Sequence, residues 1–145
     1  MSEQQNLALV QEFYAALKQG DATGLLNTLA DDVRWFVPGP KDIIPLVGQR
    51  EGARQVMQIL AKLSEMQDAE QFDVREFVAQ GDKVIALGHY RWRIKSNGQF
   101  YESDWAHAFG IRDGKISSSQ EYVDTYAWAG AYHRFEPMLA SRTRN

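Results

Sequence analysis

Two polar side chains in the C-terminal part of the chain have the types needed for proton transfer. They are His107 and Asp124, in a stretch (residues 99–126) whose alternating side chains and Asp113-Gly114 dipeptide predict two antiparallel strands joined by a tight turn. An imidazole can donate a hydrogen bond to a ligand carbonyl, or take a proton, near neutral pH. A carboxyl group among aromatic side chains is a candidate acid or base because burial disfavours its charged form. We therefore expect Asp124 to act as the acid/base and His107 to polarise a carbonyl group.

Short turns predict which side chains share a face of the sheet. Two-residue turns at Asn97-Gly98 and Asp113-Gly114 would fix the register of three strands and place Gly88 opposite His107. The predicted rows on that face are Trp92/Ser103/Asp124, Tyr90/Trp105/Tyr122 and Gly88/His107/Gln120. Because glycine leaves space, we expect an apolar chamber with a few convergent polar groups, the general form of a small-molecule site. The residues expected to bind the ligand are Tyr14, Trp35, Gly88, Tyr90, Trp92, Trp105, Gln120 and Tyr122.

The opposite face of the predicted sheet carries charge pairs and small residues. The pairs expected across neighbouring strands are Arg93 with Glu102, Arg91 with Asp104, and His89 with Glu121. This register turns Asp104 and Glu121 outward, away from the chamber. Small and apolar residues between the charges suit packing against a second copy of the chain, so we expect a homodimer through this face.

The elements that must position these residues are read from the hydrophobic pattern. Apolar spacing predicts helices over 3–19 and 51–66 and a short helix capped by Asp21, with a strand over 33–37. Strands over 72–79 and 83–95 precede the stretch 99–126, and a further short helix is expected from Ala127 through Phe135. The loop 38–50 holds an apolar stretch that either forms a flap over a site or fills the edge of the core. The prediction is an α+β domain over 1–136, with three N-terminal helices packed on a curved antiparallel sheet, and a flexible tail over 137–145.

Composition excludes several classes of function. The chain has 145 residues, a net charge of −3 and no cysteine, which argues against a nucleic-acid or membrane partner and excludes disulfides and thiolate metal sites. Its three histidines lack the spacing of metal ligands. We expect a cytoplasmic protein that binds an apolar or aromatic small molecule without a metal or other cofactor.

Three short motifs resemble the nuclear-transport-factor-2-like (NTF2-like) superfamily, and its SnoaL-like branch in particular. They are ADDVRW (30–35), FGIRDGKI (109–116) and EYVDT (121–125). The resemblance covers residues 5 to 126 and implies a cone-shaped α+β fold related to polyketide cyclases and ketosteroid isomerases. It also implies that a last-strand aspartate, here Asp124, serves as acid/base, as in SnoaL-like cyclases. The catalytic patterns of limonene epoxide hydrolases and ketosteroid isomerases are matched only in part, because Gly88, Tyr90 and Ala106 stand where those enzymes have ionisable groups.

Two functions follow as hypotheses. The first is a cofactor-free enzyme that carries out isomerisation, cyclisation or dehydration on an apolar or aromatic carbonyl compound. The second is a non-catalytic module of the same fold that binds a small ligand or assembles as a dimer. A hollow chamber with polar groups facing into it favours the first, and a filled chamber favours the second.

Overall fold

The computed structural model describes residues 2–133, which form four helices and six strands. The helices are α1 (Glu3–Gln19), α2 (Ala22–Thr28), α3 (Ala53–Met66) and α4 (Thr125–Tyr132). The strands are β1 (Leu29–Val37), β2 (Gly48–Glu51), β3 (Gln67–Gln80), β4 (Lys83–Ile94), β5 (Phe100–Arg112) and β6 (Lys115–Val123). The predicted flexible tail and the last residues of the predicted C-terminal helix lie outside the described residues. No helix within residues 2–133 is long and apolar enough to cross a membrane.

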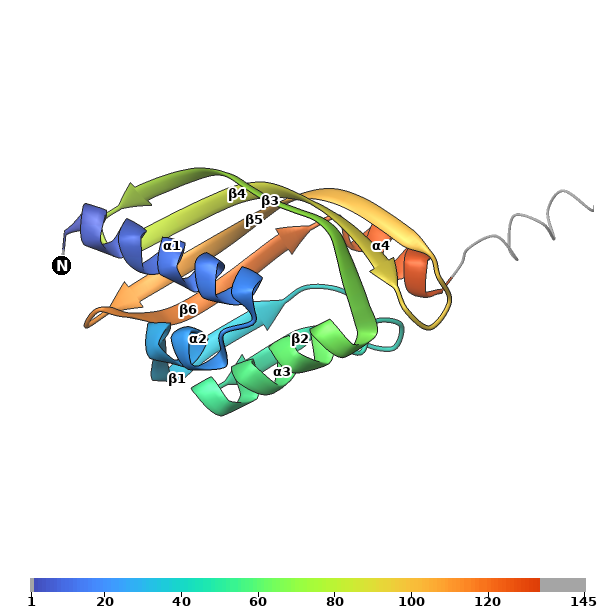
Figure 1. The fold of residues 1–145 in the computed structure, drawn as a ribbon, viewed down its shortest axis with the longest axis horizontal. Helices are drawn as coiled ribbons and strands as arrows, with labels where there is room; N and C mark the ends of the chain where they lie inside the picture. The colour runs from blue at the N-terminus through green and yellow to red at the C-terminus, as the bar shows by residue number, and fades with distance from the viewer. Residues whose placement is uncertain (1, 134–145) are drawn as a thin grey trace, which may run out of the picture.

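The strands form one curved sheet in the order β2-β1-β6-β5-β4-β3. The four strands from β3 to β6 make the predicted antiparallel meander, and β1 pairs with β6 in parallel. Figure 1 shows α1, α2 and α3 on one side of the sheet, with α4 at the end away from the N-terminus. The predicted α+β class, with three N-terminal helices on a curved sheet, is confirmed.

Local sequence signals account for where the N-terminal helices begin and end. Ser2 accepts from the Gln5 backbone N–H while the Gln5 side chain accepts from the Ser2 backbone, a reciprocal capping box before α1. Gly20 ends α1 in the left-handed conformation (φ 66°), which costs glycine little. Asp21 then accepts from Gly24 and caps α2, as predicted.

The loop between β1 and α3 fills the edge of the core. Ile44, Leu46 and Val47 are all buried, which supports the core interpretation of their apolar character, and Leu46 also lines the pocket described below. The loop also contains a short strand, β2, that pairs with β1 and was not predicted.

The predicted register between β4 and β5 is wrong by two residues. The turn at Asn97-Gly98 is longer than two residues. The Ile94 N–H donates to the Gln99 carbonyl, so residues 95–98 lie between the two bonded residues. Gly88 therefore lies opposite Trp105, and His107 lies opposite Ala86. A shift of two keeps every side chain on its predicted face, because side chains alternate with a period of two.

The predicted register between β5 and β6 is wrong by one residue beyond a bulge. Arg112 pairs with Lys115 and Ile111 with Ile116, as the Asp113-Gly114 turn predicts, but the register shifts between Gly110 and Ile111. A shift of one exchanges the two faces of a strand. The C-terminal half of β6 therefore turns Glu121 inward, opposite His107, whereas it was predicted to turn Glu121 outward.

Candidate active site

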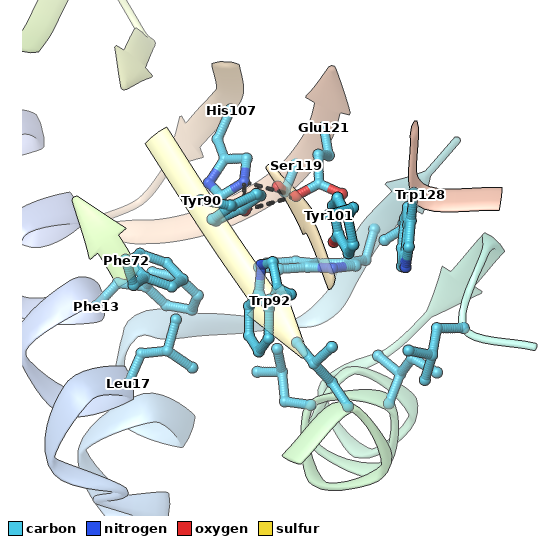
Figure 2. A pocket seen from close by; sticks show the side chains of 16 residues that line it. Phe13, Leu17, Phe72, Tyr90, Trp92, Tyr101, His107, Ser119, Glu121 and Trp128 are labelled. Atoms are coloured by element: carbon cyan, nitrogen blue, oxygen red, sulfur yellow. Dashed lines mark hydrogen bonds and ion pairs between the residues drawn. The ribbon is translucent and has the colours of Figure 1, made fainter. Parts of the chain in front are cut away.

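A pocket lies within the concave side of the sheet, with a cavity volume of about 80 Å³. That volume holds a compact group or a few water molecules, and the pocket opens to solvent at its mouth. Most of its wall is apolar or aromatic, and the ionisable groups gather at one end (Figure 2). The lining residues are Phe13, Leu17, Trp35, Val37, Leu46, Ile59, Leu60, Leu63, Phe72, Tyr90, Trp92, Tyr101, His107, Ser119, Glu121 and Trp128.

Four side chains form one hydrogen-bonded network at the polar end. The Tyr14 hydroxyl lies 2.6 Å from His107 Nδ1, and His107 Nε2 lies 2.9 Å from Glu121 Oε2. The Tyr90 hydroxyl donates to the same Glu121 oxygen at 2.7 Å and lies 2.8 Å from His107 Nε2. The side chains of His107 and Glu121 are only 12% and 15% exposed, so solvent screens their interaction weakly.

One tautomer of a neutral imidazole satisfies every hydrogen bond of this network. Within residues 2–133, the Tyr14 hydroxyl has His107 Nδ1 as its only hydrogen-bond partner, so its proton is satisfied when Nδ1 is the acceptor. The imidazole is then neutral, with its proton on Nε2, and donates toward Glu121. Glu121 Oε2 thus receives two hydrogen bonds, whereas no hydrogen bond or ion pair from the described residues reaches Oε1.

Burial keeps the tyrosine hydroxyls of the pocket protonated. Desolvation, and then the negative charge of Glu121, raises the pKa of Tyr14 and Tyr90 well above the usual value. The pKa of Tyr101 is raised by the same two causes in the same order. All three hydroxyls are therefore hydrogen-bond donors throughout the neutral range.

Trp105 supports His107 from outside the pocket. Its ring stacks on the imidazole with centroids 4.2 Å apart. The other side of the ring lies against Gly88, where a Cβ would come within 2.3 Å of it and within 1.9 Å of the Asp73 carbonyl oxygen. The space expected at Gly88 is therefore filled by this indole, and the cavity lies elsewhere in the chamber.

The expected position of Asp124 in the chamber is wrong. Its carboxylate is exposed and accepts from the Ala127 N–H at 3.0 Å, which makes Asp124 the N-cap of α4. The bulge in β6 also places Gln120 and Tyr122 on the opposite face of the sheet, where Tyr122 is 58% exposed.

The structure brings only part of the predicted set together. Trp35, Tyr90, Trp92 and His107 line the pocket, and Tyr14 adjoins it through His107. The aromatic and acidic lining residues that were not predicted are Phe13, Phe72, Tyr101, Glu121 and Trp128. The sequence does contain one signal for Glu121, since an isolated glycine within a strand, here Gly110, often marks a bulge.

Helix α4 closes one end of the pocket with Trp128. The Trp128 indole N–H and the Tyr132 hydroxyl both donate to Gln67 Oε1, at 2.9 and 2.8 Å. The Trp128 ring stacks on Tyr101 with centroids 5.8 Å apart. Asn97 adds a hydrogen bond to the carbonyl of Ala131, so α4 is held to the sheet by both polar and aromatic contacts.

Comparison with known proteins agrees with this architecture. The model of the SnoaL-like domain family matches residues 10–119. An NTF2-like protein of Burkholderia xenovorans is 39% identical, with a TM-score of 0.85 over 92% of this chain and 99% of that chain. TerC, crystallised with polyporic acid, is 25% identical, with a TM-score of 0.76 over 88% of this chain and 98% of its own.

A candidate polyketide cyclase of Xanthomonas campestris shares the fold at 23% identity, with a TM-score of 0.72 over 90% of this chain and 99% of that chain. No protein of curated function matches the sequence. The family match spans most of the chain and the NTF2-like relatives share its whole fold. The chain therefore belongs to the SnoaL-like family of NTF2-like proteins.

Proposed function

We propose that this protein is a cofactor-free enzyme that moves a proton on an apolar or aromatic carbonyl compound, leading to isomerisation, cyclisation or dehydration. One observation carries the proposal. Glu121 lines the pocket and is held by two hydrogen bonds on Oε2, whereas Oε1 has no hydrogen-bond partner among residues 2–133. A carboxylate oriented in this way and surrounded by apolar walls is suited to act as a general base.

The reaction begins with the removal of a proton from the carbon next to the substrate carbonyl. Glu121 Oε1 takes that proton, and the electron pair of the C–H bond moves to the carbonyl oxygen to give an enolate. The hydroxyl of Tyr90 and the Nε2–H of His107 are the nearest donors in the lining, and one of them can turn to the enolate oxygen once Glu121 is neutral.

The enolate then determines the outcome. Return of the proton from Glu121 to a different carbon completes an isomerisation. Attack of the enolate carbon on a second carbonyl forms a ring and an alkoxide, which takes the proton back from the Glu121 carboxyl group to give an alcohol. In dehydration, Glu121 then removes a second α-proton, the alcohol oxygen leaves as hydroxide, and that proton joins it to give water. Each step only moves protons, so no oxidant or reductant is needed.

Two further observations support a carbonyl compound with an aromatic or apolar body. The lining offers many aromatic surfaces, including Trp35, Trp92 and Trp128. TerC, which has the same fold, was crystallised with the quinone polyporic acid.

Proton exchange in D₂O tests the proposal directly. We expect the protein to speed the exchange of α-protons in 2-tetralone or acetophenone, measured by NMR. Glu121→Gln should lower that rate by about 100-fold or more, the usual contribution of a general base. Asp104→Asn, which removes an exposed carboxylate from the opposite face, is the matched control. Equal rates for wild type and Glu121→Gln, or no exchange above background on any ketone, would contradict the proposal.

A homodimer through the outer face of the sheet is a second proposal, supported by exposed apolar side chains there. Val78 is 55% and Tyr122 58% exposed, and the small Ala106 and Ala108 lie beside them in the outward rows. A flat sheet face with a small-residue centre suits an isologous contact. Tyr122→Arg should convert a dimer into a monomer in gel filtration, whereas Arg112→Ala, at the end of β5, should not. A wild-type monomer at high concentration would exclude this arrangement.

A further inference from the structure

We infer that the pocket takes a ligand carrying a compact organic cation, a protonated or quaternary amine, held between aromatic rings against the Glu121 carboxylate. This inference names a substrate class for the site of the proposed function. It rests on that function only in that both assign a role to Glu121. Binding of the cation is measured separately from proton transfer, so each idea can fail alone.

The first argument is the unbalanced charge of the pocket. Among residues 2–133, Glu121 is the only acidic residue in the lining, and neither lysine nor arginine is present there. Its one ion-pair contact within residues 2–133 is to His107, whose imidazole is neutral in the arrangement that satisfies the Tyr14 hydroxyl. A buried carboxylate without a cation is unfavourable, because apolar surroundings solvate charge poorly. A ligand cation would supply the missing positive charge.

The second argument is the nature of the walls around that carboxylate. In Figure 2, the Glu121 carboxylate points toward Tyr90 and Tyr101, with Trp92 and Trp128 around the space beneath it. Tyr101 stacks with Trp128, and Tyr90 packs against Trp92 at 5.7 Å, so the rings form two paired walls. The faces of tryptophan and tyrosine rings attract cations that lie within about 6 Å.

A third wall completes the enclosure. The Trp35 ring contacts Phe13 and Phe109, but among the described rings it has no contact with Trp92 or Tyr101. All three residues line the same pocket. A group bounded by rings on several sides and by a carboxylate at one end resembles the aromatic cages that bind quaternary ammonium ions.

The same features select against other ligand charges. An anionic group would face the Glu121 carboxylate without a lysine or arginine to pair with it. A neutral apolar group would fill the space but would leave the carboxylate without a cation. The pocket therefore distinguishes ligands of the same shape by their charge.

Calorimetry with three ligands of similar size tests this inference. The probes are (3-hydroxyphenyl)trimethylammonium, its neutral isostere 3-tert-butylphenol, and the anion 3-hydroxybenzoate. We expect the wild-type protein to bind the ammonium compound about tenfold more tightly than the isostere, as two or more cation–π contacts and one charge pair imply, and to bind the benzoate most weakly. Glu121→Gln should reduce the preference to about twofold or less while leaving the affinity for 3-tert-butylphenol unchanged.

Two further variants complete the test: Trp92→Leu tests the inference if Glu121→Gln does not fold, and Asp104→Asn is the control. Trp92→Leu should weaken binding of the ammonium compound more than binding of 3-tert-butylphenol, because it removes a ring face but keeps an apolar side chain. Asp104→Asn should behave as wild type. Equal affinities for the ammonium compound and the isostere, or a preference that survives in Glu121→Gln, would overturn the inference. Ketone exchange that depends on Glu121 would then still support the proposed function, whereas a clear cation preference without any exchange would support the inference alone.

Discussion

The sheet carries a histidine–carboxylate pair on each of its faces, and the two pairs have the same contact distance. His107 Nε2 lies 2.9 Å from Glu121 on the inner face, and His89 Nδ1 lies 2.9 Å from Asp104 on the outer face. Their surroundings differ, because Glu121 is 15% exposed and Asp104 is 87% exposed. Water and salt weaken the outer interaction, while the inner pair depends on its protein partners. The reactivity of a histidine–carboxylate pair therefore depends on the burial of the pair and not on its contact distance.

The two faces also differ in how their polar groups are connected. On the outer face, His89 reaches both Asp104 and Glu102, and Arg91 also pairs with Glu102, so the charges form an exposed chain. On the inner face, the carboxylate is surrounded by hydroxyl and imidazole groups and no lysine or arginine joins the network within the described residues. A network with a negative charge and only neutral donors keeps its carboxylate reactive toward a ligand.

The largest expected effect is a loss of stability at alkaline pH, caused by the buried tyrosines of the inner face. The folded-state pKa values of Tyr14, Tyr90 and Tyr101 lie above the ordinary value of 10.0, so these groups stabilise the fold fully below pH 10. Above pH 10 the unfolded chain loses these protons and the folded chain keeps them. The free energy of unfolding should therefore fall by up to about 4 kcal/mol per pH unit for three protons.

Denaturant melts between pH 9 and 11 measure this fall. Burial also raises the pKa of Tyr132 to about 12, so four protons contribute to the slope of stability against pH. Tyr90→Phe removes one of them and should reduce that slope by about one quarter. Tyr122→Phe, on the outer face, should leave the slope unchanged. A slope that is the same for both variants would mean that the inner tyrosines do not cause the loss of stability.

Replacing each histidine by phenylalanine compares the two pairs directly. His107→Phe leaves the Tyr14 hydroxyl without an acceptor and removes one donor from Glu121, so it should lower the free energy of unfolding by about 3 kcal/mol. His89→Phe removes an exposed interaction and should cost about 0.5 kcal/mol or less. Urea titration of both variants at pH 7 gives the two values. If the two losses were equal, burial would not be what distinguishes the faces.

Most of the fold could be predicted from the sequence because its signals are local. Helix α1 begins and ends where the apolar spacing and Gly20 indicate, and Asp21 caps α2. The meander follows from period-two alternation and short turns. The parallel pairing of β1 with β6 involves residues far apart in sequence, and no local pattern specifies it.

The candidate site was harder to predict because one bulge decides it. His107 was placed on the inner face correctly, since the error of two residues at Asn97-Gly98 does not change the face. The bulge places the extra residue, Ser117, in β6 opposite Gly110, so the acid of the inner face is Glu121 and not Asp124. The extra residue lies in a run of three serines (117–119) whose alternation carries no hydrophobic signal, and only Gly110 on the facing strand hints at it.

The smallest expected effect is that of replacing Asp124, and it tests whether Asp124 or Glu121 is the catalytic acid. Asp124 caps α4 through the Ala127 N–H, so Asp124→Ala should cost about 1 kcal/mol of stability, the usual value of an N-cap. Because Asp124 is exposed and Glu121 lines the pocket, ketone exchange should be unchanged in Asp124→Ala at temperatures where the variant is folded. Asp124→Ser is the matched control, since serine also caps helices and should restore the stability. If Asp124→Ala and Asp124→Ser both lost ketone exchange while remaining folded, Asp124 would be the catalytic acid. The inward position of Glu121 would then not determine catalysis.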